Sequence, residues 1–287
     1  MRIPTLLVLV IAFTSAQADP VIASGKKFAF LGDSITQYGA SNTAGYVSLV
    51  TAALKLNGIE VETIPAGIAG NTSDDMLARL DADILAKKPD FMTLSCGVND
   101  VLKGAAGVPL ERYKANILAI VEKAQAAGVK PIILTATMIS ENPDEYTNKN
   151  LAPYNDFLRE LAKDKKLMLA DVNAAMLKAV PEAKAASAPR WNKDYYLTCD
   201  SIHMGPQGDQ LMAEVVLRTL GLTDAQIAKA RTAWQDIPKA VSLEFKRQIT
   251  LREYQAIAER AAKENLSFAE YLDREFQKTL SDAAVSH

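Results

Sequence analysis

The sequence predicts an α/β protein: a three-layer α/β/α sandwich around a five-stranded parallel sheet, followed by a C-terminal helical extension. Three observations predict this fold. Short apolar runs alternate with longer segments of helical period between residues 25 and 221. Successive runs are separated by enough chain for a crossover helix, which favours parallel strands with helices on both faces. From residue 222 onward the strand patterns disappear and only helical patterns remain.

The first 18 residues have the pattern of a secretory signal peptide. Arg2 precedes an apolar run over residues 6–13, and Ala16-Gln17-Ala18 is an Ala-x-Ala cleavage signature. The run is short for a membrane span, no other segment is apolar enough for one, and no cysteine follows the cleavage site to carry a lipid. We therefore expect a secreted or periplasmic protein; an uncleaved anchor is the alternative.

The composition is that of a globular domain with a substantial core. Of the 287 residues, 49% are hydrophobic, and the formal net charge of −2 leaves no basic excess for a nucleic-acid partner. Cys96 and Cys199 are too few for a disulfide framework, so two free thiols and one bridge both remain open. The oligomeric state is not predicted by these features.

Five strands are expected where apolar and β-branched residues cluster and a turn or helix signal follows. They are residues 27–31, 59–64, 91–95, 131–136 and 167–170. The second is followed by a glycine-rich turn at 65–70, and the third ends at Cys96-Gly97. Because the strands are parallel, their carboxyl ends share one edge of the sheet, where open α/β sheets bind ligands.

Five helices are expected to alternate with these strands. They are residues 45–56, 72–86, 109–127, 151–163 and 207–220. Asn57-Gly58 ends the first at a typical C-cap. Thr72 and Asp75 have capping-box spacing at the start of the second, and Pro109 and Gly128 delimit the third.

The C-terminal extension, residues 222–287, is predicted to be helical. Three residue pairs have capping-box spacing before a helical run: Thr223 and Gln226, Thr250 and Glu253, Ser267 and Glu270. The last helix carries an apolar stripe formed by Phe268, Tyr271, Leu272, Phe276 and Leu280. We expect this stripe to bury against the sandwich; a partner subunit or a lid over the site is the alternative.

One strand end carries a candidate nucleophile. The first apolar run stops at Gly32-Asp33-Ser34, which brings a hydroxyl to the ligand-binding edge. A nucleophilic serine needs a base and a group that orients the base. Of the two histidines, His287 is the last residue, so His203 is the candidate base. Asp200 can orient it if the loop bends back; the alternative acids are Asp194 and Asp209.

Two turns at the next strand ends are candidate donors for an oxyanion. The turn of residues 67–72 opens a helix, and a glycine there lets a backbone N–H approach the substrate. The turn of residues 97–100 contains Asn99, whose side-chain amide can point to the same place. Alone, each turn is more typical of a helix cap or an Asx turn. The functional interpretation depends on all three strand ends meeting at one edge.

Four short blocks, in order, carry a family resemblance. They are Gly32-Asp33-Ser34-Ile35-Thr36, Gly67-Ile68-Ala69-Gly70-Asn71-Thr72, Gly97-Val98-Asn99-Asp100 and Asp200-Ser201-Ile202-His203. Together they resemble the SGNH hydrolase superfamily, the GDSL-like lipase/acylhydrolase group, over about residues 25–221. The C-terminal helices lie outside the resemblance. The one departure is isoleucine after the serine, where the family pattern has leucine.

The resemblance implies a five-stranded flavodoxin-like sandwich that hydrolyses esters through an acyl-enzyme. Ser34 would be the nucleophile, His203 the general base and Asp200 its orienting partner. Backbone N–H groups of Ser34 and Gly70, with the side chain of Asn99, would form the oxyanion hole. Because the base must be neutral to accept a proton, we expect activity to fall below about pH 6.5.

Other chemistries are less well supported. Residues 93–97 resemble the Gly-x-Ser-x-Gly elbow of α/β-hydrolases but lack its first glycine. Cys199 lies near His203, yet packing explains it better than a role as nucleophile. His-Glu-x-x-His, Gly-x-Gly-x-x-Gly and Walker motifs are absent from the sequence, so we expect no metal and no cofactor. A ligand-binding module on an inactive hydrolase scaffold is disfavoured by the complete set of candidate residues.

The substrate is the least defined prediction. Trp191, Tyr195 and Tyr196 precede Asp200 and can form a platform for sugar rings, or they pack the last connection. Export, a near-neutral surface and the lack of a hydrophobic signal for a lipid-binding lid favour a short acyl ester, such as an acetate, of a carbohydrate or another polar alcohol. Lysophospholipid or thioester hydrolysis is the alternative, as is a transacylase that uses the same site.

Overall fold

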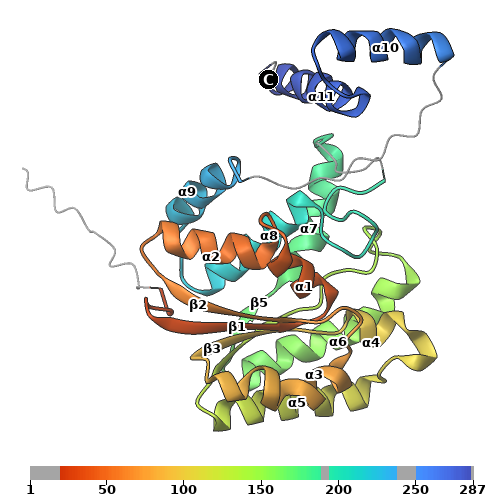
Figure 1. Ribbon diagram of the computed structural model, residues 1–287. Helices are drawn as coiled ribbons and strands as arrows, with labels where there is room; N and C mark the ends of the chain where they lie inside the picture. Colours follow the sequence, from red (N-terminus) through yellow and green to blue (C-terminus); the bar gives the residue numbers. More distant parts are fainter. Residues whose placement is uncertain (1–19, 189–193, 238–249, 286–287) are drawn as a thin grey trace, which may run out of the picture. The chain divides into compact units, whose positions relative to one another are not determined.

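The computed structural model describes residues 20–188, 194–237 and 250–285 (Figure 1). The chain divides into two compact units, one up to residue 240 and one from residue 241. The predicted signal peptide and Trp191 lie outside the described residues.

Five parallel strands form the sheet of the first unit, in the order β2-β1-β3-β4-β5. They are β1 (Lys26–Gly32), β2 (Val61–Gly67), β3 (Phe91–Ser95), β4 (Lys130–Leu134) and β5 (Met168–Ala170). Phe28 of β1 pairs with Thr63 on one side and with Phe91 on the other. This is the flavodoxin-like order, and it confirms the predicted fold class. The order reverses between β1 and β3, so a ligand site is expected outside the ends of these two strands.

Helices cover both faces of the sheet (Figure 1). In the first unit they are α1 (Ser34–Ser41), α2 (Tyr46–Leu56), α3 (Ser73–Asp83), α4 (Val98–Leu102), α5 (Leu110–Ala126), α6 (Tyr146–Asp164), α7 (Val172–Ala185), α8 (Pro206–Thr219) and α9 (Asp224–Trp234), with 3₁₀ turns at Leu85–Lys87 and Gly104–Ala106. Helices α3, α5 and α6 lie on one face, and α1, α2, α7, α8 and α9 lie on the other.

Alternation along β1 produces two cores. Phe28 and Phe30 point into the core shared with α2 and α8, whereas Ala29 and Leu31 point into the core shared with α3 and α5. All four are fully buried, as expected for a parallel strand covered on both faces. Burial of each large apolar side chain contributes about 1.5–3 kcal/mol. The two cores therefore fix the end of β1 and the residues that follow it.

The differences from the predicted elements have clear physical reasons. The sequence predicts the second strand at residues 59–64, whereas β2 spans Val61–Gly67 and includes Pro65. An edge strand tolerates proline because it has no second neighbour that needs the missing N–H. The pattern does not predict α7, because Pro181 lies inside this helix. It also treats α1 and α4 as turns, because both helices are short.

The described part of the C-terminal extension is helical, as predicted. Helix α9 begins beyond residue 221 yet packs on α2 and α8, burying Ile227 and Trp234. Within its described residues the second unit contains α10 (Leu251–Lys263) and α11 (Phe268–Val285), which pack on each other with Tyr254 stacked on Phe268. The three predicted capping boxes are formed. Burial of the apolar stripe of α11 against the sandwich stays a prediction.

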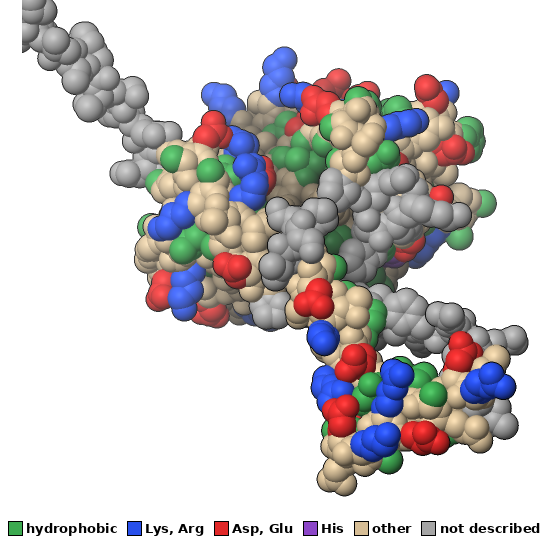
Figure 2. Space-filling view, turned by 90° about the horizontal axis from the view of Figure 1, so that it is seen from above, with side chains coloured by type: hydrophobic (Ala, Val, Ile, Leu, Met, Phe, Trp, Pro, Cys, Tyr) green, Lys and Arg blue, Asp and Glu red, His purple; other side chains and the backbone are tan. Residues whose placement is uncertain are grey.

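The described surface carries charges of both signs. On the face drawn in Figure 2, acidic and basic side chains are interspersed and neither sign forms a large patch. None of the described helices is long and apolar enough to cross a bilayer.

Candidate active site

The candidate nucleophile lies where β1 passes into α1. Asp33 caps the helix by accepting a hydrogen bond from the Ile35 N–H at 2.9 Å, and Ser34 is the first helical residue. Ser34 is only 8% exposed, so its side chain is largely shielded from solvent at the carboxyl edge of the sheet. The first N–H groups of a helix lack partners within it and carry its positive dipole end. This environment suits a negative charge that develops beside Ser34.

Gly67 allows α1 to approach the end of β2 closely. A Cβ at this position would lie 2.2 Å from the Gln37 backbone nitrogen, so a larger residue would push α1 away from the sheet. Gln37 in turn accepts a hydrogen bond from the Ala69 N–H at 2.7 Å. The first helix and the end of β2 thus position each other.

Asp200 and His203 lie at the tip of a hairpin formed by residues 197–205, which we name the base hairpin. Its arms are joined by an antiparallel bridge and by backbone hydrogen bonds of 2.7 and 2.8 Å. Ser201 turns the chain with a φ of 80°, in the left-handed region that few residues other than glycine adopt. The loop therefore bends back, as the sequence interpretation requires.

The structure joins three of the predicted site residues in one chain of hydrogen bonds. Ser34 Oγ lies 2.9 Å from His203 Nε2, and His203 Nδ1 lies 2.7 Å from Asp200 Oδ2. The other Asp200 oxygen accepts the backbone N–H groups of Ile202 and His203. With Nδ1–H donating to Asp200, Nε2 presents the lone pair that can accept the serine proton.

Hydrogen bonding keeps Asp200 ionised. Burial raises the pKa of this carboxyl group, but the bonds from the His203 side chain and from the backbone outweigh burial and hold the pKa below its usual value. An ionised Asp200 stabilises an imidazolium beside it. The alternative acids are placed differently: Asp209 accepts the Tyr46 N–H at 3.0 Å, and Asp194 is exposed.

The predicted oxyanion donors follow β2 and β3, at the same edge as Ser34. Gly70 lies in the glycine turn (residues 67–72) with a φ of 77°, and its N–H donates to no acceptor among the described residues. The Asn99 side-chain amide donates to the Asn71 carbonyl at 3.1 Å and to the Asp33 carboxylate at 3.3 Å. Asn99 therefore joins the glycine turn to the turn that carries the nucleophile.

A guanidinium group that the sequence interpretation misses holds these turns together. One terminal nitrogen of Arg79 in α3 donates to the carbonyls of Gly32 and Ala66 at 2.9 and 2.8 Å. Its Nε donates to Asn71 Oδ1 at 2.6 Å. One side chain thus ties the ends of β1 and β2 to the glycine turn. The only local signal is its position, about two helical turns after the N-cap residue Thr72 of α3.

Two buried carboxyl groups support the same edge. Asp33 is 2% exposed, and burial raises its pKa to about 6, although the Ile35 N–H and the His203 charge lower it. Asp100 accepts both the N–H and the hydroxyl of Ser73, at 2.9 and 2.6 Å. Burial raises the pKa of Asp100 as well. These bonds fix α4, which carries the amide donor, against the start of α3.

The predicted aromatic platform is only partly described. Tyr195 and Tyr196 are half-buried, and Tyr196 packs against the core beneath α2 and α8. The structure adds Tyr38 of α1, which the sequence interpretation misses. Its ring lies 5.2 Å from the His203 ring, centre to centre, and is 49% exposed. Tyr38 follows Ser34 by one helical turn, a spacing that has meaning only once α1 is known to be a helix.

Both cysteines are free, so the alternative of a bridge is not formed. Cys96 is buried, and burial raises the pKa of its thiol well above the usual value. In the described ranges, His, Cys, Asp and Glu side chains form no group of three or more that could hold a metal ion.

The site blocks coincide with a family model. The model of the GDSL-like lipase/acylhydrolase family matches residues 30–211, well over half of the chain. The chain belongs to this family. The predicted resemblance is confirmed, and membership makes the protein a carboxylic ester hydrolase of the SGNH type.

Three relatives of this chain are named as ester or thioester hydrolases. An acetylxylan esterase of Geobacillus stearothermophilus is 27% identical over 220 residues, covering 70% of this chain and 96% of that protein. The crystal structure of an acetyl xylan esterase is similar with a TM-score of 0.62 and 30% identity, covering 67% of this chain and 98% of that one. Thioesterase 1/protease 1/lysophospholipase L1 of Escherichia coli strain K12 is 25% identical over 164 residues, covering 57% of this chain and 71% of that protein.

Proposed function

We propose that the protein is a secreted serine esterase that removes acetyl or other short acyl groups from a carbohydrate or another polar alcohol. The observation that carries the proposal is the hydrogen-bonded chain from Ser34 through His203 to Asp200, with distances of 2.9 and 2.7 Å. Related structures support these roles. Three structures of the Geobacillus esterase are of catalytic mutants, with a serine, an aspartate or a histidine replaced by alanine.

Acylation begins when Ser34 Oγ attacks the ester carbonyl carbon while His203 Nε2 takes the hydroxyl proton. The carbonyl oxygen becomes an oxyanion that accepts hydrogen bonds from the N–H groups of Ser34 and Gly70 and from the Asn99 amide. Such donors are effective because they are already oriented in a site with little water. The intermediate collapses as the imidazolium gives its proton to the leaving alcohol, which leaves an ester on Ser34.

Deacylation repeats these steps with water. His203 takes a proton from a water molecule, whose oxygen attacks the acyl carbon of the Ser34 ester. Collapse of the second oxyanion returns the proton to Ser34 Oγ and releases the carboxylic acid. Asp200 stays ionised throughout and holds the imidazolium in place in both halves of the cycle.

The short acyl group and the sugar-like alcohol are supported by different observations. Two of the relatives described above, 27% and 30% identical to this chain, are named acetylxylan esterases. The alcohol leaves beside His203, where the exposed Tyr38 ring offers a flat surface for the C–H face of a sugar. A cavity of about 320 Å³ next to it has a mixed lining, with polar side chains that include Asn42 and Asp200 and apolar ones that include Ile35 and Met204. Tyr195, Tyr196 and Trp191 remain candidates for further contacts.

Export is supported by the N-terminal pattern of Arg2, the apolar run and the Ala-x-Ala signature. One relative, 25% identical over 234 residues, is a lipoprotein of Bacillus subtilis. Amino-terminal sequencing of the protein recovered from the periplasm or medium tests the cut after Ala18.

A panel of p-nitrophenyl esters from acetyl to palmitoyl, with an acetylated xylo-oligosaccharide measured by acetate release, tests the substrate class. The proposal expects kcat/KM to fall as the acyl chain lengthens and the oligosaccharide to be deacetylated. Ser34→Ala is the control and is expected to lose at least about 10⁴-fold in kcat. A preference for long chains would favour the lysophospholipase/thioesterase alternative. Undiminished turnover by Ser34→Ala would exclude the mechanism.

The E. coli relative named a thioesterase and lysophospholipase keeps that alternative open. A transacylase is separated from a hydrolase by the fate of the acyl group, because water and an acceptor hydroxyl compete for the same acyl-enzyme. Acyl transfer to an added sugar at the expense of free acid would identify the transacylase.

A further inference from the structure

One carboxylate outside the candidate site accepts four hydrogen bonds from the base hairpin and the residue before it. Glu141 Oε1 accepts the N–H of Leu197 and the N–H and hydroxyl of Thr198, at 2.7, 2.7 and 2.9 Å. Its Oε2 accepts the Tyr196 N–H at 2.7 Å. Three successive backbone donors thus converge on a single side chain. Bonds from N–H to an ionised carboxylate are among the strongest in proteins.

These donors need the carboxylate because they lie outside the sheet. Leu197 and Thr198 are 5% and 0% exposed, so water cannot replace a lost partner for them. Each buried N–H left without an acceptor costs about 1–3 kcal/mol. The arm that leads to Asp200 is therefore held in place largely by Glu141.

Two sets of contacts connect Glu141 to the reacting nitrogen, His203 Nε2. Leu197 accepts the Gly205 N–H, and Thr198 bridges to Met204, so the carboxylate fixes both arms of the base hairpin. At the tip, Asp200 sets the orientation of His203 Nδ1 at 2.7 Å. A shift of either arm would change the direction in which Nε2 meets Ser34.

Glu141 is itself held rigidly. The Asn148 side-chain amide donates to the carbonyls of Ser140 and Asn142, both at 2.8 Å, and its oxygen accepts the Ile139 N–H at 2.9 Å. The backbone on both sides of Glu141 is therefore fixed.

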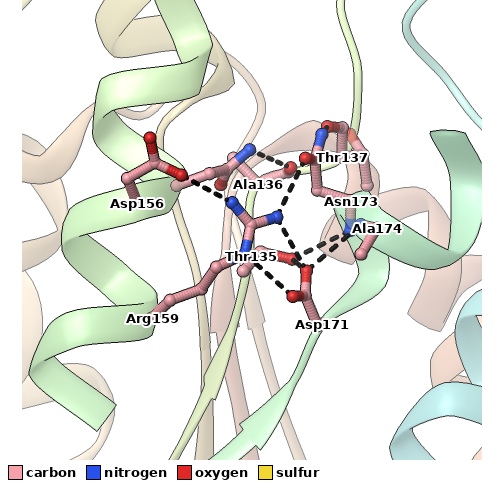
Figure 3. Close-up of polar contacts among 9 residues, drawn as sticks. Thr135, Ala136, Thr137, Asp156, Arg159, Asp171, Asn173 and Ala174 are labelled. Carbon is pink, nitrogen blue, oxygen red and sulfur yellow. Dashed lines mark hydrogen bonds and ion pairs between the residues drawn. The ribbon is translucent and has the colours of Figure 1, made fainter. Parts of the chain in front are cut away.

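The root of the Glu141 loop is also anchored. Figure 3 shows the segment after β4 bonded to α6 and to the start of α7. Asn173 donates to the Thr137 carbonyl at 2.6 Å, and Arg159 bonds to both Asp171 and Asn173. The loop that presents Glu141 is thus fixed at its root as well as around the carboxylate.

We propose that Glu141 is a positioning residue for the base: its carboxylate holds the base hairpin so that His203 Nε2 faces Ser34. The inference rests on the proposed function, in which His203 is the base, but it does not depend on the substrate. Glu141 acts through the hairpin backbone.

Graded variants test this role. In Glu141→Ala all four bonds are lost, and a misplacement of the base by about 1 Å reduces kcat by about 10²-fold. In Glu141→Gln the amide oxygen can keep the three bonds made to Oε1. The amide NH₂ group would face the Tyr196 N–H, so that one bond is lost and the decrease in kcat is smaller than in Glu141→Ala. Thr198→Val removes the hydroxyl bond alone and has the smallest effect. KM is expected to change little in all three.

The pH profile and a proton resonance separate positioning from general destabilisation. As the hairpin loosens, Asp200 stabilises the imidazolium less, so the acid limb of the kcat/KM profile moves to lower pH. The proton shared by His203 and Asp200 loses its far-downfield NMR resonance in the resting enzyme. The control is Glu214→Gln, because Glu214 forms a two-bond pair with Arg231 of α9. It is expected to lower stability without moving the limb or the resonance.

The outcomes are distinguishable. Unchanged kcat, acid limb and resonance in folded Glu141→Gln and Glu141→Ala would overturn the inference, as would equal shifts in Glu214→Gln. If Glu141→Ala does not fold, Glu141→Gln and Thr198→Val carry the test. If the wild type hydrolyses no ester, the proposed function fails, while loss of the resonance in Glu141→Gln still supports the positioning role.

Discussion

The two halves of the proposed site are built in opposite ways. The nucleophile half, formed by Asp33, Ser34, Gly70 and Asn99, follows three strand ends. Asp33 and Ser34 are 2% and 8% exposed, and Gly70 and Asn99 are half-buried. The base half, Asp200 and His203, lies on an irregular hairpin, and the Asp200 side chain is 51% exposed. The nucleophile half is held by the sheet and by Arg79, the base half by Glu141.

This difference separates two tasks. Groups that stabilise a developing charge are most effective where water is excluded and where backbone geometry leaves them no freedom, as at a strand end. A base must exchange its proton with solvent in each cycle, so it is better placed at an accessible tip. Changes in the nucleophile half should therefore alter electrostatics and stability, whereas changes in the base half should alter geometry and the pH profile.

Asp200→Asn, in the base half, is expected to reduce activity more than either Asn99→Ala or Asp33→Asn in the nucleophile half. An amide in place of the carboxylate no longer stabilises the imidazolium and favours the tautomer with the proton on Nε2, which cannot accept the Ser34 proton. We expect kcat to fall about 10³–10⁴-fold. Initial rates with p-nitrophenyl acetate from pH 5 to 9 measure the loss together with the displacement of the acid limb.

The matched control is Asp194→Asn, an exposed carboxylate beside the base hairpin that the sequence leaves as an alternative acid. It is expected to leave kcat and the pH profile unchanged. A loss in Asp194→Asn comparable to that in Asp200→Asn would show that the base half is oriented by a different acid.

The same contrast explains what the sequence could predict. The strands and the groups at their ends are predictable, because apolar runs and glycine turns are local patterns and a parallel sheet brings its carboxyl ends together. Asp200 is predictable only because it lies three residues from His203. Glu141 is 56 residues from Leu197, and Arg79 is 47 residues from Gly32. No local pattern marks such partners, since they are defined by tertiary contact alone.

Asn99→Ala is expected to cause the next largest loss of activity, without the change in pH profile expected for Asp200→Asn. Loss of one oxyanion donor reduces kcat by about 10²–10³-fold with little change in KM. Because the base half is untouched, the acid limb should stay where it is in the wild type. Asn57→Ala, which removes a helix-capping amide of α2, serves as the control and should retain kcat. A displaced acid limb in Asn99→Ala would show that the two halves are not separable.

Asp33→Asn is expected to have the smallest effect, and it raises stability. The Asp33 pKa is raised by burial from 3.8 to about 6, so the folded state binds this proton more tightly than the unfolded state does. Well below pH 3.8 the carboxyl is neutral in both states and costs nothing. Above pH 6 it is ionised in both, and the folded state bears a penalty of about 3 kcal/mol. Loss of the bond from Asn99 offsets about 1 kcal/mol of this in the variant.

Urea unfolding should therefore show Asp33→Asn to be about 2 kcal/mol more stable than the wild type at pH 7. Well below pH 3.8 the ionisation penalty is gone, and loss of the bond from Asn99 should leave the variant about 1 kcal/mol less stable. Asp90→Asn is the control, for which the expected change in stability at pH 7 has the opposite sign. The pKa of Asp90 is lowered by hydrogen bonds from the Lys26 side chain and the Lys27 N–H, so its stabilisation is present at pH 7 and lost as the pH falls below 4. A pH-independent effect of Asp33→Asn would contradict the burial argument. A stability gain with lower kcat would show that the nucleophile half keeps a buried acid beside Ser34 because that acid orients Asn99.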